Sequence, residues 1–115
     1  MTVRSLKLDL KTSQDLSLGA LSYTSSTGRK FKLEEVILHA SIAISEIVTI
    51  TRDSKHGANY DHVLSKRSLI SEQDFIFRPT GECNFQDDDE IKVQCSNSNG
   101  LGIVYLTIKR QEILI

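Results

Sequence analysis

The chain has 115 residues, of which 39% are hydrophobic and 25% are charged, and its formal net charge is −1. This length suits one domain that buries about two-thirds of the surface exposed by its unfolded form, and the composition lacks the features of disorder. The balance of 14 basic against 15 acidic residues provides no overall field for nucleic acid or anionic lipid, so we predict neither as a partner.

The first residues contain no membrane or secretory signal. Residues 1–7 alternate between apolar and polar side chains, without the continuous apolar segment of a signal peptide. The longest mostly apolar stretch, residues 36–50, is interrupted by polar side chains and is shorter than the roughly 20 apolar residues that span a bilayer. We therefore expect synthesis in the cytoplasm and no transmembrane helix.

The N-terminal part predicts one strand and one ambiguous segment. Leucines at 6, 8 and 10 alternate with polar residues, which is the period of a half-buried strand. Residues 16–25 fit either a short strand or an irregular arm. We divide the chain into an N-terminal strand or arm, residues 1–22, which can lie across a neighbouring subunit, and a sandwich domain, residues 23–115.

The middle of the chain predicts a long strand with a bulge. Phe31 and Leu33 share one parity, whereas apolar residues from Val36 to Ile42 share the other. One extra residue near Glu34 and Glu35 would return both sets to the same face. Residues 48–50 then alternate again, and the polar stretch 51–59 is typical of a hairpin connection.

The remaining strands are predicted at residues 60–64, 75–78, 91–95 and 103–109, with Pro79 ending the second of them. Asn97–Gly100 predicts a hairpin turn between the last two strands, because Asn and Gly tolerate the positive φ of primed turns. Seven or eight short strands without covering helices predict an all-β fold in which two antiparallel sheets form a sandwich.

No pattern of residues predicts catalysis or a cofactor. The three histidines, His39, His56 and His62, lack neighbours at metal-ligand spacing, so we interpret them as surface or half-buried side chains. Neither a nucleophile elbow nor a glycine-rich phosphate loop is present. We predict a protein that is not an enzyme and that has no catalytic residues, metal or cofactor.

Two further features have simple structural interpretations. The acidic run Asp87–Glu90 lacks the alternate spacing of a calcium loop, so we interpret it as a solvated turn before a strand. Cys95 continues an alternating apolar series and is expected to be buried as a small hydrophobe. A disulfide between Cys83 and Cys95 is a minor alternative that requires an oxidising environment.

The C-terminus is the one candidate contact surface in the sequence. Ile113, Leu114 and Ile115 follow the last predicted strand, which we expect to end near Lys109. They either fold back onto the sandwich or cover a neighbouring subunit, and we take them as candidate intersubunit contacts.

Five stretches mark the starts and ends of the predicted strands: Phe31–Val36, Ala58–Asp61, Phe77–Pro79, Asp88–Val93 and Asn97–Gly100. Together they resemble small jelly-roll proteins of tailed bacteriophages, which serve as capsid cement or decoration proteins. This resemblance implies a jelly-roll sandwich and a non-enzymatic structural protein of the virion.

The resemblance also implies partners. We expect the major capsid protein or another virion protein, together with a homo-oligomer, with a trimer favoured. The alternative is a carbohydrate-binding or receptor-binding sandwich module of a tail fibre or surface protein, although the absence of Trp weakens sugar binding.

Overall fold

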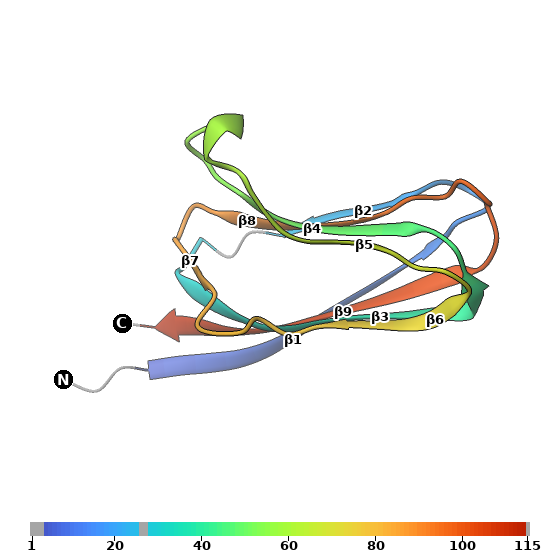
Figure 1. The fold of residues 1–115 in the computed structure, drawn as a ribbon. Helices are drawn as coiled ribbons and strands as arrows, with labels where there is room; N and C mark the ends of the chain where they lie inside the picture. The colour runs from blue at the N-terminus through green and yellow to red at the C-terminus, as the bar shows by residue number, and fades with distance from the viewer. Residues whose placement is uncertain (1–3, 26–27, 115) are drawn as a thin grey trace.

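The computed structural model describes residues 4–25 and 28–114 and consists of two antiparallel sheets packed face to face (Figure 1). Sheet A has the strand order β1-β9-β3-β6, with the short β7 paired to β3, and sheet B has the order β2-β8-β4-β5. Their bounds are β1 Arg4–Asp15, β2 Leu21–Ser25, β3 Phe31–Ile44, β4 Ile47–Asp53, β5 His62–Ser68, β6 Glu72–Phe77, β7 Asn84–Phe85, β8 Glu90–Cys95 and β9 Ile103–Leu114. A five-stranded and a four-stranded antiparallel sheet, whose main strands interleave in the order of a jelly roll, form this sandwich, so the predicted fold class is confirmed.

The core lies between the sheets and follows the period-2 alternation of the strands. Alternate residues of β8 are buried, and β9 buries Val104, Leu106 and Ile108 in the same manner. The predicted bulge in β3 is confirmed, because the register with β9 shifts between Leu33 and Glu35. This shift keeps the apolar residues on both sides of the bulge directed into the core.

The N-terminal residues are part of the sandwich. Strand β1 pairs with β9 from Arg4 to Asp15, and Leu16 is fully buried. Strand β2, which begins at Leu21 and pairs with β8, crosses the domain boundary that we placed at residue 22. The segment that was ambiguous in sequence thus ends in a short strand.

Two local predictions are wrong in detail. Asn97–Gly100 forms a turn in which the Gly100 N–H donates to the Asn97 carbonyl at 2.9 Å, but β8 and β9 belong to different sheets, so the turn closes no hairpin. A primed turn needs positive φ at its central residues. Gly100, the last residue of this turn, has positive φ, but Ser71 is the only non-glycine residue with positive φ in the described part of the chain, so this turn is not a primed one. Residues Ala58–Tyr60 form a 3-10 turn, so β5 begins at His62.

A buried carboxylate joins the connections at one end of the sandwich. Glu46, on the β3–β4 connection, is 3% exposed. Its carboxylate accepts hydrogen bonds from the Ser96 hydroxyl and from the backbone N–H groups of Ser98 and Asn99, each at 2.9 Å. Its carbonyl accepts a bond from the Leu69 N–H at 2.8 Å. One residue therefore ties together the β3–β4, β5–β6 and β8–β9 connections.

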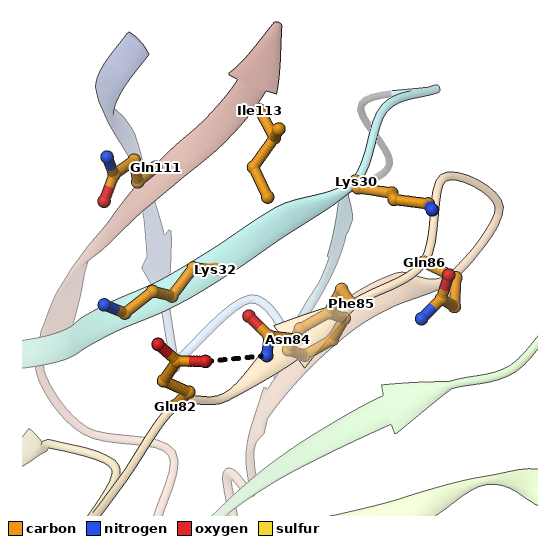
Figure 2. Close-up of a pocket in the computed structure, with 8 residues that line it drawn as sticks. All are labelled: Lys30, Lys32, Glu82, Asn84, Phe85, Gln86, Gln111 and Ile113. Carbon is orange, nitrogen blue, oxygen red and sulfur yellow. Dashed lines mark hydrogen bonds between the residues drawn. The ribbon is translucent and has the colours of Figure 1, made fainter. Parts of the chain in front are cut away.

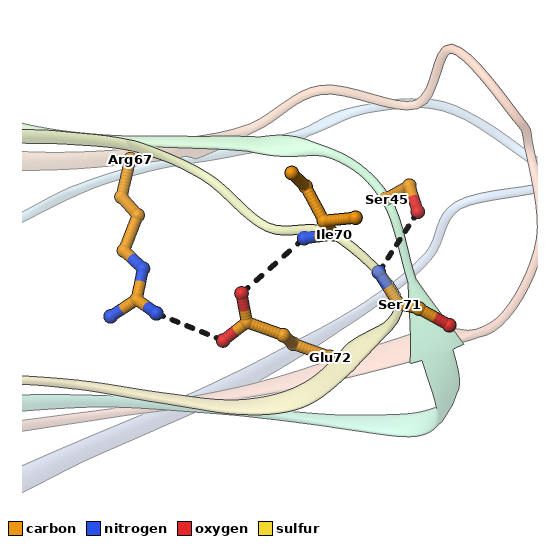
Figure 3. A network of polar contacts seen from close by, with 5 residues as sticks. All are labelled: Ser45, Arg67, Ile70, Ser71 and Glu72. Carbon is orange, nitrogen blue, oxygen red and sulfur yellow. Dashed lines mark hydrogen bonds and ion pairs between the residues drawn. The ribbon is translucent and has the colours of Figure 1, made fainter.

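The β5–β6 connection is held by a second polar network, shown in Figure 3. The Arg67 guanidinium and one oxygen of the Glu72 carboxylate are 3.0 Å apart, and the other oxygen accepts a bond from the Ile70 N–H. The Ser71 N–H donates to the Ser45 hydroxyl at 3.0 Å. Because Ser45 precedes Glu46, this network strengthens the same end of the sandwich.

We predict that Glu46→Gln destabilises the protein. The amide replaces one carboxylate oxygen with a donor that faces another donor, and a buried donor without an acceptor costs about 1–3 kcal/mol. Urea unfolding should show this loss in the free energy of unfolding. Ser98→Ala is the matched control, because it keeps the backbone N–H that Glu46 binds. Equal stability of Glu46→Gln and the wild type would contradict this role for Glu46.

Candidate functional site

The candidate site is a groove at the opposite end of the molecule, where β7 lies beside the start of β3 and the end of β9 (Figure 2). Its volume is about 620 Å³. The residues that line it are Lys30, Lys32, Glu82, Asn84, Phe85, Gln86, Gln111 and Ile113. The walls therefore combine two cations, one carboxylate and three side-chain amides with an aromatic ring and an aliphatic side chain.

An aromatic stack holds β7 in place. The rings of Phe31 and Phe85 are stacked with their centroids 4.5 Å apart, and both residues are almost completely buried. The Leu33 N–H donates to the Cys83 carbonyl at 2.9 Å, which fixes the chain just before β7. Because side chains alternate along a strand, Lys32 points outward between the buried Phe31 and Leu33.

The charges of the groove are only partly balanced. Neither Lys30 nor Lys32 has an ion pair within the described residues, whereas the Glu82 carboxylate accepts a 3.4 Å bond from the Asn84 side chain. In Figure 2, Lys32 lies on the Glu82 side of the groove and Lys30 on the Gln86 side. The groove therefore offers two ammonium groups to a ligand.

Neighbouring residues extend this pattern. The register places Lys32 opposite Gln111 and Gln111 opposite Lys7, so that these three side chains form one row on the outer face of sheet A, the face turned away from sheet B. A smaller hollow beside the groove is lined by Arg29, Lys30 and Asp87, among others. Among the residues that line these two hollows, three are basic (Arg29, Lys30 and Lys32) and two are acidic (Glu82 and Asp87).

The structure extends the last strand beyond its predicted end. Strand β9 continues from Lys109 to Leu114, and Leu114 pairs with Arg4, so the expected end near Lys109 is wrong. Ile113 is half-buried and lines the groove. The side chain of Leu114 and all of Ile115 lie outside the described residues, and intersubunit contact by these three residues stays a prediction.

The inner face of β9 carries two charged residues near its end, which we did not predict from the sequence. Arg110 and Glu112 continue the inward series of β9 and are 5% and 7% exposed. Their charged groups are 3.7 Å apart, and the guanidinium also donates to the Ser25 hydroxyl and lies over the Phe31 ring. Since they occupy the inner positions, the alternation turns Gln111 and Ile113 outward into the groove.

The histidines lie apart from one another, and none of them lines the groove. His39 is exposed on the outer face of sheet A, where its Nδ1 is 2.6 Å from the Asp74 carboxylate and its ring stacks on Tyr105. His56 contacts Tyr60 edge to face. His62 Nδ1 lies 3.5 Å from the Arg52 guanidinium.

The acidic run differs partly from its interpretation as a solvated turn. Asp89 is only 8% exposed, and its carboxylate accepts a 3.0 Å bond from the Gln86 N–H, so it closes the turn before β8. Within residues 4–25 and 28–114, no three His, Cys, Asp or Glu residues are grouped as a metal site would require. In the same residues no helix is long and apolar enough to cross a membrane.

Sequence reasoning missed both the groove and Glu46. Lys30 and Lys32 flank the buried Phe31 with strand period, and this was the available signal for an outward cationic pair. Glu46 is the only charged residue in the apolar stretch 36–50, which was the signal for a buried carboxylate.

No family model matches the chain, and no curated protein matches it. Among solved structures, the chain is similar to the Drosophila NLP core, whose structure is described as providing insight into pentamer formation and histone binding. The sequences are 14% identical, the match covers 90% of this chain and 97% of that chain, and the TM-score is 0.48.

The predicted function is corrected on these findings. The comparisons give no support to a tailed-phage cement or decoration protein, and the similar structure named above is described by pentamer formation and histone binding, so that prediction is withdrawn together with its capsid partners and its trimer. At this identity and TM-score, neither histone binding nor a pentamer is transferred to this chain.

We predict that the two thiols react at very different rates. Both cysteines are free, so the alternative of a disulfide is not realised. Burial raises the pKa of the Cys83 thiol, and burial together with the Glu46 charge raises the pKa of Cys95 to about 11. At pH 8 a thiol reagent should modify the half-buried Cys83 first and Cys95 only after unfolding. Cys83→Ser should abolish the early phase, and its persistence would contradict this assignment.

The raised pKa of the Cys95 thiol also makes the stability of the folded protein depend on pH. The folded chain holds the Cys95 proton more strongly than the unfolded chain, so this contribution to stability is complete below the unfolded pKa and is lost as the pH rises toward 11. Cys95→Ala should reduce the alkaline loss of stability measured by urea unfolding.

Proposed function

We propose that this protein is a non-enzymatic binding module whose groove at β3, β7 and β9 holds an acidic, extended segment of a partner protein. The observation that carries the proposal is the pair Lys30 and Lys32, which lie in one groove without an ion pair in the described part of the chain. Carboxylates are the natural counter-ions of such a pair, and complementary charge supports both specificity and association rate.

The other walls favour a polypeptide over a phosphate backbone. The amides of Asn84, Gln86 and Gln111 offer donors and acceptors that match peptide groups. The Glu82 carboxylate can accept a peptide N–H, which a phosphate backbone does not offer. Ile113 adds an aliphatic contact.

The outer face of sheet B carries two lysines that serve as control positions for the groove lysines. Lys66 and Lys92 lie opposite Thr49 and Thr51 in the ladders, so they stand on the outer face of that sheet. They have the same charge as the groove lysines but do not line the proposed groove. They therefore separate binding in the groove from a general effect of net charge.

The experiment measures binding of a fluorescein-labelled hexaglutamate peptide by anisotropy at low salt. We expect saturable binding by the wild type and at least about a tenfold loss of affinity in the double variant Lys30→Glu and Lys32→Glu, because two attractive charges become repulsive. Adding salt should weaken binding through screening.

The double variant Lys66→Glu and Lys92→Glu is the matched control, because it changes the net charge by the same amount on the other sheet. It should bind close to the wild type. Equal loss in both double variants would show that only net charge matters, and absence of binding by the folded wild type would reject the groove.

A further inference from the structure

Strand β1 is a long edge strand with a free side. It is at the end of sheet A and pairs only with β9, from Arg4 to Asp15. In an antiparallel sheet about half of the backbone N–H and C=O groups of an edge strand point away from its neighbour. Within the described residues, no other strand forms a ladder with β1. In Figure 1, the start of β1 extends past the end of sheet B.

The other edges offer less to a partner. Strand β2 has five residues, and β5 and β6 have seven and six. Strand β6 is followed closely by Pro79, which has no N–H to donate. Strand β1 has 12 residues and also leaves Leu6 44% exposed on the side of sheet A that faces the core. It is therefore the longest of these edges, and it also carries uncovered apolar surface.

The charges along β1 are self-complementary. Lys7, Asp9 and Lys11 alternate on the outer face, while Leu6, Leu8 and Leu10 alternate on the inner face. A two-fold axis through Asp9 would oppose like charges, Asp9 to Asp9 and Lys7 to Lys11. An axis through Leu8 instead pairs each Lys7 with the Asp9 of the second copy, and it sets Leu6 opposite Leu10.

The register with β9 extends this complementarity across the sheet. Glu35 lies opposite Lys109, and Lys109 lies opposite Asp9. In the Leu8-centred register the next side chain in the row is Lys7 of the second copy. The charges in this row then alternate in sign across four strands. Lysines that served only to block edge pairing would not need this alternation.

From this pattern we infer that β1 pairs with β1 of a second copy around a two-fold axis at Leu8, so that residues 4–12 of the two chains form an antiparallel ladder. Sheet A then continues through both molecules as one sheet. Such an interface is isologous and closes at a dimer. It does not depend on the groove proposed above as a binding site.

The first experiment uses charge reversal and sedimentation equilibrium. The wild type should be a dimer. Lys7→Asp and Asp9→Lys should each weaken dimerisation at least about tenfold, because each places like charges opposite one another twice per dimer. An equimolar mixture of the two variants should recover the dimer, since Asp at 7 then faces Lys at 9 and Lys7 faces Asp9. Circular dichroism checks that each variant keeps its strands.

The second experiment reads the register directly, in a Cys83→Ser background. Directly opposed residues of an antiparallel pair have Cα atoms about 4.5–5.5 Å apart, within disulfide range. Leu8→Cys should therefore form an intermolecular disulfide readily, whereas Leu6→Cys and Leu10→Cys should not. A monomeric wild type, dimerisation unaffected by either charge reversal, or preferential cross-linking at position 10 would each overturn the inference.

Discussion

The buried carboxylate of Glu46 is the constraint on which the arrangement of this sandwich depends. A jelly roll must cross repeatedly between its sheets, and the crossing segments expose backbone groups that need partners. Glu46 supplies acceptors to the β8–β9 connection through its carboxylate and to the β5–β6 connection through its carbonyl. The β8–β9 connection in turn contacts the first crossing, because the Leu16 N–H donates to the Gly102 carbonyl. All four crossings at this end are thereby linked.

The opposite end is built differently, and the two proposed contact surfaces arise there. Strands β1 and β9 reach past sheet B, and β7 is attached beside β3 by the Phe31–Phe85 stack. The long strands create an uncovered edge, and the attached β7 creates a groove. The buried pair of Arg110 and Glu112 turns the alternate β9 residues outward, so an inner-face ion pair helps to shape an outer-face site.

The local pattern located most of the strands but did not predict the connections between them. The change of parity between Leu33 and Val36 predicted the bulge, because burial on one face fixes the register. Asn97–Gly100 predicted a turn correctly but a hairpin wrongly, because turn residues define the local chain path and not the sheet that the next strand enters. The groove joins residues from β3, β7 and β9, which are far apart in sequence, so no local spacing could predict it.

Glu46 joins the connections at one end of the sandwich, and the other end carries the proposed binding groove. Amide hydrogen exchange along the chain, with and without the acidic peptide, measures both ends in one experiment. We expect slow exchange at Ser98 and Asn99 in the free protein, despite their exposed side chains, and added protection on binding that is confined to residues 28–33, 82–87 and 109–114. Fast exchange at Ser98 and Asn99, or peptide-induced protection at residues 96–102 instead of the groove, would contradict this expectation.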